Sequence, residues 1–109
     1  MTLVSEFVPV CLLDEVPEEG AHRVVVGNIP VAVVRSVGRV FAIYDVCSHA
    51  EVSLSEGEVD RGTIECWLHG SRFDLATGEP TGLPATRPVP VYPVKIEGDR
   101  ILVAVTQES

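Results

Sequence analysis

The sequence predicts an all-β domain, a small antiparallel sandwich or barrel, from three observations. The chain has 109 residues, of which 46% are hydrophobic and 22% charged, as expected for a single domain over residues 1–109. Short valine-rich runs alternate with Gly or Pro roughly every eight to twelve residues. No window longer than about ten residues combines a helical period with freedom from Gly and Pro.

Strands are expected where these runs are rich in β-branched and aromatic residues. They cover Val24–Val26, Pro30–Arg35, Val40–Tyr44, Gly57–Asp60, Thr63–Cys66, Tyr92–Glu97 and Arg100–Val105. Turn residues that tolerate positive φ separate most of them, at Gly27-Asn28, Val37-Gly38, Arg61-Gly62 and Gly98-Asp99. Val46–Ser55 can hold a short helical turn. The prolines of residues 76–93 favour a stiff extended loop over a central strand.

The charge balance excludes some partners. Sixteen Asp and Glu against eight Lys and Arg give a net charge of -8, which opposes binding to nucleic acid or to an anionic membrane and favours a basic protein partner. The apolar run Ile29–Val34 is far shorter than the roughly 20 residues that span a bilayer. The first Lys or Arg is Arg23, unlike the start of a secretory signal. We therefore expect a soluble, cytoplasmic and monomeric protein.

Cysteine and histidine form two clusters, Cys47-Ser48-His49 and Cys66-Trp67-Leu68-His69, each just after a predicted strand. Three cysteines in a chain without an export signal argue against a disulfide framework and for metal binding. A 2Fe-2S cluster can take two thiolates on one iron and two neutral imidazoles on the other. Such a centre is neutral when oxidised, whereas four thiolates give a charge of minus two, so the mixed centre accepts an electron more easily.

Other uses of these residues fit less well. Structural zinc also takes two Cys and two His, but zinc fingers usually group the cysteines together and the histidines together. A catalytic Cys-His pair would need a residue to orient the histidine, and none is apparent. A mononuclear iron oxygenase site needs two further histidines and a carboxylate, and only His22 remains, which is expected to be a surface or strand-start histidine. Cys11, within Val10–Leu13, is expected to be an inward-facing thiol of a strand without chemistry.

The spacing Cys-x-His, sixteen residues, Cys-x-x-His, followed by Gly70-Ser71, resembles the Rieske iron-sulfur family. The Asp45-Val46 lead-in, the Leu54-Ser55-Glu56-Gly57 stretch and the run from His69 to Asp74 resemble the ferredoxins of bacterial aromatic-ring-hydroxylating dioxygenase systems, of the biphenyl dioxygenase type. The resemblance covers nearly the whole chain and implies a Rieske fold with a cluster-binding part at about residues 45–85.

The resemblance implies one 2Fe-2S cluster, with Cys47 and Cys66 on one iron and His49 and His69 on the other. It implies an electron carrier, not an enzyme, that takes electrons from a flavoprotein NAD(P)H reductase and passes them to a terminal oxygenase. Three residues are expected to lie around the cluster. Ser71 donates to a bridging sulfide, Pro84 lies in a third loop that covers the cluster, and Trp67 either shields the cluster or fills the core, both of which predict burial.

Three alternatives remain open at this point. The same fold and ligands would serve an accessory or sensor subunit of another redox or iron-sulfur system, and a zinc-stapled β module would bind partners without redox chemistry. The acidic residues near the ligand loops form either a docking rim for a basic partner or an ordinary solvated face. These residues are Glu51, Glu56, Glu58, Asp60 and Glu65.

Phe73 stands where the respiratory branch of the family has a tyrosine that donates to a ligand sulfur. Val52 and Leu68 stand where that branch has a disulfide. Fewer donors stabilise less of the added negative charge, so we expect a reduction potential toward the low end of the family's range, about -150 to +300 mV. Phe73→Tyr should raise the midpoint potential measured by voltammetry. An unchanged or lower potential would contradict this explanation.

Overall fold

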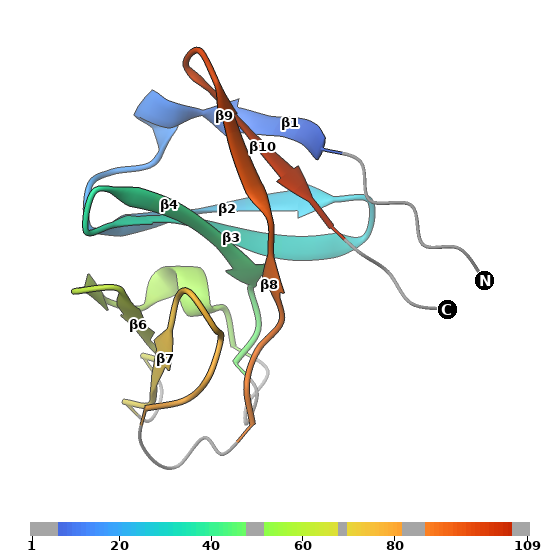
Figure 1. Cartoon of the computed structure of the whole chain (residues 1–109). Coiled ribbons are helices and arrows are strands. Elements are labelled where there is room, and N and C mark those ends of the chain that lie inside the picture. The colour runs from blue at the N-terminus through green and yellow to red at the C-terminus, as the bar shows by residue number, and fades with distance from the viewer. Residues whose placement is uncertain (1–6, 48–51, 68–69, 82–86, 106–109) are drawn as a thin grey trace.

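The computed structural model describes residues 7–47, 52–67, 70–81 and 87–105, which form antiparallel β-sheets and two short 3-10 turns (Figure 1). The strands are β1 (Phe7–Leu12), β2 (Gly20–Val26), β3 (Ile29–Ser36), β4 (Arg39–Tyr44), β5 (Val59–Asp60), β6 (Thr63–Glu65), β7 (Arg72–Asp74), β8 (Val91–Tyr92), β9 (Val94–Glu97) and β10 (Arg100–Ala104). The 3-10 turns are η1 (Leu13–Glu15) and η2 (Leu54–Glu56). The predicted all-β antiparallel class is confirmed. No helix in these ranges is long and apolar enough to cross a membrane.

The strands form three layers. The sheet β2-β3-β4-β8 lies between the sheet β1-β10-β9 and the small sheet β5-β6-β7, as Figure 1 shows. The middle layer has to bury both of its faces, so β3 reads as a continuous apolar run instead of an alternating one. Val31 and Val33 pack into one core with residues of β10, and Ala32 and Val34 pack into a second core with residues of β6 and β7. The strand β3 therefore belongs to both cores.

Hairpin turns lie at all four predicted pairs of turn residues. Each joins consecutive antiparallel strands through two residues. Val37 and Gly38 have φ of 48° and 73°, and Arg61 and Gly62 have φ of 53° and 79°. Positive φ at both central residues is the geometry of a type I′ turn, whose twist matches the twist of the flanking strands. These turns fix the register of β3 with β4 and of β5 with β6.

The predicted strand Tyr92–Glu97 is wrong as a single element. It is two strands, β8 paired with β4 and β9 paired with β10, separated by Pro93. Proline has no N–H to donate, and its fixed φ favours a change of direction. The Pro93 carbonyl accepts a hydrogen bond of 3.1 Å from the Ala104 N–H, so the chain passes from one sheet to the next at this residue.

Short or polar strands account for the other differences. The strand β2 begins at Gly20, four residues before the expected start at Val24. The prediction missed this first half of the strand because its residues are only partly buried and weakly apolar. The strand β7 has three residues and was not expected as a strand. The strand β1 begins before the predicted Val10–Leu13 run and ends at Leu12, where η1 starts.

The start of the proline-rich segment folds back along β7. The Asp74 N–H donates to the Glu79 carbonyl at 2.8 Å, the Thr81 N–H donates to the Arg72 carbonyl at 2.8 Å, and Pro80 forms an isolated bridge with Phe73. In its described part the segment lies in no central strand, as expected. Residues 82–86, which include Pro84, lie outside the described residues.

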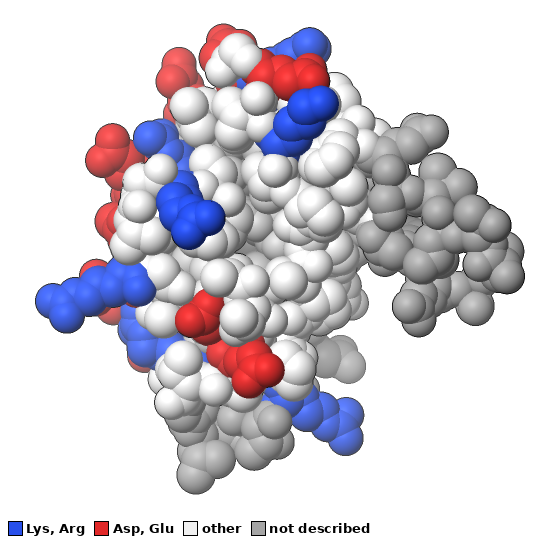
Figure 2. All heavy atoms as spheres, viewed as in Figure 1, with Lys and Arg blue, Asp and Glu red and all other residues white. Residues whose placement is uncertain are grey.

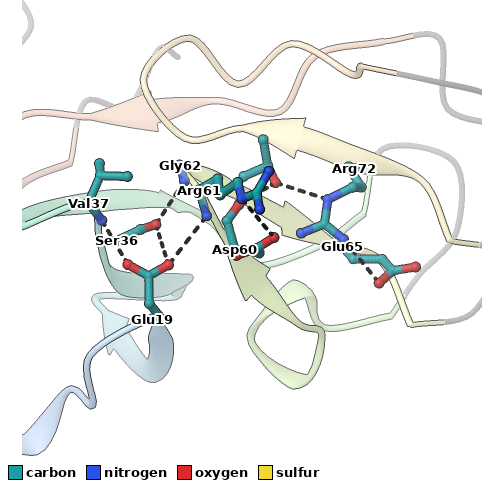
Figure 3. Close-up of polar contacts among 9 residues, drawn as sticks. Glu19, Ser36, Val37, Asp60, Arg61, Gly62, Glu65 and Arg72 are labelled. Carbon is teal, nitrogen blue, oxygen red and sulfur yellow. Dashed lines mark hydrogen bonds and ion pairs between the residues drawn. The ribbon is translucent and has the colours of Figure 1, made fainter.

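A single carboxylate, Glu19, joins the turn of the β3–β4 hairpin to the turn of the β5–β6 hairpin (Figure 3). It accepts hydrogen bonds of 2.8 Å from the Val37 N–H and the Ser36 hydroxyl and one of 3.3 Å from the Arg61 N–H. The Ser36 hydroxyl oxygen in turn accepts from the Gly62 N–H at 2.8 Å. Four polar contacts thus tie the middle sheet to the small sheet.

Protonation of Glu19 should weaken this tie. The hydrogen bond from the Val37 N–H, with those from Ser36 and Arg61, lowers the pKa of the Glu19 carboxyl below its ordinary value of 4.5. Because the folded pKa is depressed, the contribution of Glu19 to the unfolding free energy is complete above about pH 5 and is lost as the pH falls through the folded pKa. Glu19→Gln should lack this contribution and depend less on pH between about pH 5 and 3 in urea unfolding. Parallel pH curves for the two proteins would contradict the role of Glu19.

Gly57 lies where the backbones of η2 and β6 come together. A Cβ atom on Gly57 would lie 1.6 Å from the Glu65 carbonyl oxygen, so one of the two segments would have to move. Gly57→Ala should lower the unfolding free energy by about 3 kcal/mol in urea titrations. Gly27→Ala is the matched control, since φ is +63° there but nothing lies within 4 Å of the added carbon, and only about 1 kcal/mol of backbone strain is expected. Equal losses in the two variants would refute the steric explanation.

Candidate metal centre

The thiols Cys47 and Cys66 lie in one apolar core. Cys47 follows the end of β4 and is 3% exposed, and Cys66 directly follows β6 and is fully buried. Both belong to the core formed between the middle sheet and the small sheet, together with Leu54 and Phe73. All three cysteines of the chain lie in its described part, and none of them is in a disulfide. The fold thus brings together two of the four predicted ligands.

Two loops of similar construction begin at these cysteines. The Cys47 N–H donates to the Val52 carbonyl at 3.0 Å, and the Cys66 N–H donates to the Ser71 carbonyl at 2.6 Å. Each loop therefore returns to its own cysteine five residues later. The Gly70 N–H also donates to the Cys66 carbonyl at 2.9 Å, with φ of +80° at Gly70. The predicted ligands His49 and His69 belong to these two loops, but both lie outside the described residues.

Of the residues predicted to surround the centre, two are buried near the cysteines and one is exposed. Phe73 lies on β7 and Ser71 directly before it, and both are fully buried. The predicted burial of Trp67 is wrong, because its side chain is 51% exposed. Trp67 lies beyond β6, in the turn that the Gly70 N–H closes onto the Cys66 carbonyl. The position of Pro84 lies outside the described residues.

Asp45 is a buried charged residue that the sequence analysis treated only as part of a motif. Its carboxylate is fully buried and accepts hydrogen bonds from the Ser55 N–H at 2.6 Å and the Ser55 hydroxyl at 2.8 Å. The Arg23 guanidinium forms an ion pair with it at 2.8 Å and also donates to the Ser53 hydroxyl at 2.8 Å. The sequence signal for this cluster is weak, since Arg23 is far from Asp45 along the chain.

The acidic residues near the ligand loops, for which a docking rim and an ordinary solvated face were both open, have basic neighbours where the structure describes them. Glu56, Glu58 and Asp60 are exposed, but Asp60 lies 3.8 Å from the guanidinium of Arg61. Glu65 is only partly exposed and forms an ion pair with Arg72 at 3.2 Å. On the face seen in Figure 2, basic and acidic side chains are interspersed around an uncharged centre. That face carries no continuous acidic patch. Glu51 lies outside the described residues.

Cys11 and His22 lie away from the two thiols. Cys11 is a partly buried residue of β1 that packs against the core between the two larger sheets, as expected. Burial, with a smaller effect of Glu15, raises the pKa of the Cys11 thiol, so little reactive thiolate forms at neutral pH. His22 lies inside β2 opposite Val33 and not at a strand start.

The donor set fits an iron-sulfur cluster. Thiolates are the ligands that such clusters take from proteins, and an apolar shell with backbone N–H groups nearby sets how readily the cluster is reduced. Cys47 and Cys66 have this shell, and each begins a closed loop that contains a histidine. The arrangement fits two thiolate and two imidazole ligands from two loops.

Comparisons with known proteins agree with this chemistry. The family model described as Rieske [2Fe-2S] domain matches residues 6–93. The chain is 40% identical over 102 residues to the anthranilate 1,2-dioxygenase ferredoxin subunit of Burkholderia cepacia, and the alignment covers 94% of each protein. Among solved structures it is similar to the ferredoxin of carbazole 1,9a-dioxygenase from Nocardioides aromaticivorans IC177, with 42% identity, a TM-score of 0.85, and coverage of 90% of this chain and 96% of that one.

A third similarity is to a structure described as a complex of reduced oxygenase and oxidized ferredoxin in carbazole 1,9a-dioxygenase. The identity is 36% and the TM-score 0.83, with 90% of this chain and 92% of that one covered. The family model covers most of the chain, and the relatives match along nearly their whole length. With the buried thiols and their two closed loops, these matches show that the chain belongs to the Rieske [2Fe-2S] domain family.

Proposed function

We propose that the chain is a Rieske ferredoxin that carries single electrons to a terminal oxygenase. The ligands we assign are Cys47 and Cys66 on one iron and His49 and His69 on the other. The observation that carries the proposal is the pair of buried thiols, each at the start of a loop closed by the N–H of the cysteine itself. When bound, the cluster supplies one-electron chemistry at potentials of about -150 to +300 mV.

The residues around the two thiols would perform three tasks. The apolar core that holds Cys47 and Cys66 excludes water from their side of the centre. Ser71, buried and five residues beyond Cys66, is the hydroxyl donor that we assign to a bridging sulfide. The half-exposed Trp67 lies on the solvent side of Cys66, where a protein partner can reach it.

The partners follow from the relatives. Proteins named as ferredoxin subunits of dioxygenases are electron-transfer components, and the solved complex pairs such a ferredoxin with its oxygenase. By this similarity the acceptor is a terminal oxygenase and the chain itself is not the catalyst. We assign a flavoprotein NAD(P)H reductase as the donor, and a monomeric carrier in the cytoplasm, where NAD(P)H is supplied.

Electron paramagnetic resonance of the purified chain tests the centre. The oxidised protein should be silent, and dithionite should produce a rhombic Rieske-type signal, with two irons and two sulfides per chain. Because a thiolate is anionic and an imidazole is neutral, His69→Cys should load iron and sulfide but lower the reduction potential by adding a negative ligand. Stoichiometric zinc and no signal after reconstitution with iron and sulfide would favour the zinc-stapled module instead.

Electron delivery is the second half of this test. The probe is the terminal oxygenase of the Nocardioides carbazole system, because its ferredoxin is 42% identical to this chain. The reduced chain, mixed anaerobically with the oxidised oxygenase, should lose its electron to it in stopped-flow absorbance. A cluster that reduces normally but delivers no electron to this oxygenase would favour the accessory or sensor role.

A further inference from the structure

The two loops that begin at Cys47 and Cys66 are held together differently at their necks, that is, at the residues where each loop leaves the fold and returns to it. The second loop leaves β6 and returns in β7, where Glu65 and Arg72 are register partners. The strand ladder therefore closes this neck, and the ion pair of Glu65 with Arg72 lies on its partly exposed side, with side chains 32% and 29% exposed. As a cross-strand pair beside a ladder that already closes this end of the loop, it adds a modest contribution, and Arg72 Nε also donates to the Thr63 hydroxyl at 2.9 Å.

The first loop has no such ladder. It leaves the sheet after β4 ends at Tyr44 and reaches η2 at Leu54, and the described residues on its two sides belong to no common strand pair. Among its described residues, the loop is closed by the hydrogen bond from the Cys47 N–H to the Val52 carbonyl. Side chains of β2 add contacts between its two ends.

Arg23 of β2 spans the two ends of the first loop. Its Nη1 donates to Asp45 Oδ2 before the loop and to Ser53 Oγ after it, each at 2.8 Å. Asp45 itself reaches past the loop to the Ser55 N–H and hydroxyl. The Asp45 N–H donates to the Pro30 carbonyl at 3.0 Å, which fixes the same residue to β3. Asp45 and Arg23 thus replace the missing ladder.

The burial of Asp45 makes the loss of its cationic partner costly. The Asp45 side chain is fully buried and that of Arg23 is 46% exposed. Loss of one partner of a buried pair leaves an uncompensated buried charge, which costs much more than loss of an exposed pair. The first neck therefore depends on its ion pair, whereas the second neck does not.

We propose that Asp45 and Arg23 are positioning residues that hold the first loop in the shape that presents Cys47 to the iron-sulfur cluster. The inference rests on the proposed function, which places Cys47 among the ligands. Neither residue touches the cluster in this assignment; both act through the loop. Their loss should therefore change how tightly the cluster is held and the geometry of its ligands.

The test measures cluster loss from the purified, oxidised holoprotein in the presence of a chelator, by decay of visible absorbance. Asp45→Asn and Arg23→Gln should each lose the cluster about tenfold faster than the unmodified chain, since about 1.4 kcal/mol of lost positioning corresponds to tenfold. Arg23→Lys keeps the charge and should give an intermediate rate. The reduced forms of Asp45→Asn and Arg23→Gln should also show shifted resonance g values.

Two controls separate positioning from general stability. Arg72→Gln removes the ion pair of the second neck and the hydrogen bond from Arg72 Nε to the Thr63 hydroxyl, but it leaves the strand ladder in place, so the rate should stay within about twofold of the unmodified rate. Glu19→Gln weakens the fold away from the loops, so it lowers the unfolding free energy without moving the g values. Should Asp45→Asn fail to fold, Arg23→Gln still decides, because Arg23 is half-exposed.

Two results would overturn the inference. One is a rate and g values in Arg23→Gln and Asp45→Asn equal to those of the unmodified chain. The other is a Glu19→Gln rate as fast as theirs with the same g-value shift, since that would trace the effect to overall stability. An unmodified chain that binds no cluster would instead overturn the proposed function, and the inference with it.

Discussion

The burial of β3 on both faces is the constraint on which the rest of the structure depends. Val31 and Val33 fill the core under β10, and Ala32 and Val34 fill the core that contains the two cysteines. A strand with two apolar faces has to be covered on both, so the small sheet cannot leave the middle sheet without exposing that second face to water. The candidate centre is fixed in place by the same burial that stabilises the fold.

Polar contacts then set the details that apolar packing leaves open. Apolar packing has little directional preference, so it places the small sheet against β3 without fixing its turns. Glu19 joins the two hairpin turns, and Asp45 with Arg23 joins the two ends of the first loop. Both carboxylates accept backbone or guanidinium hydrogens, which are directional bonds. These directional bonds thus fix the two hairpin turns and the two ends of the first loop.

Much of the fold could be predicted because its signals are local. The four turns needed only neighbouring residues that tolerate positive φ, and the strands β3 and β4 needed only a dense apolar run. The division at Pro93 was missed because two strands in different sheets read as one run of β-forming residues in the sequence. The strand β7 was missed because three residues carry too little pattern to show a period. Pairing with distant strands decided both cases.

The two cysteines of the candidate site could be singled out from the sequence, but the residues that support their loops could not. Cys47 and Cys66 stand beside histidines at a recognisable spacing, and the fold buries both thiols in one core. Arg23 and Asp45 are 22 residues apart, and a salt bridge between distant strands leaves no periodic trace. Trp67 was expected to be buried, because it is an apolar residue beside Cys66. Its half-exposed position shows that apolar character alone does not predict burial in a turn.

An electron carrier gains from this division between a rigid frame and two short loops. A centre that changes its ligand geometry little on reduction transfers electrons with little reorganisation, so its loops should be held from outside and not by the metal alone. The second loop has a strand ladder for this, and the first has the ion pair of the buried Asp45 with Arg23 of a neighbouring strand. In both cases the restraint comes from the protein frame, and the exposed side chain next to Cys66 stays available for contact with a partner.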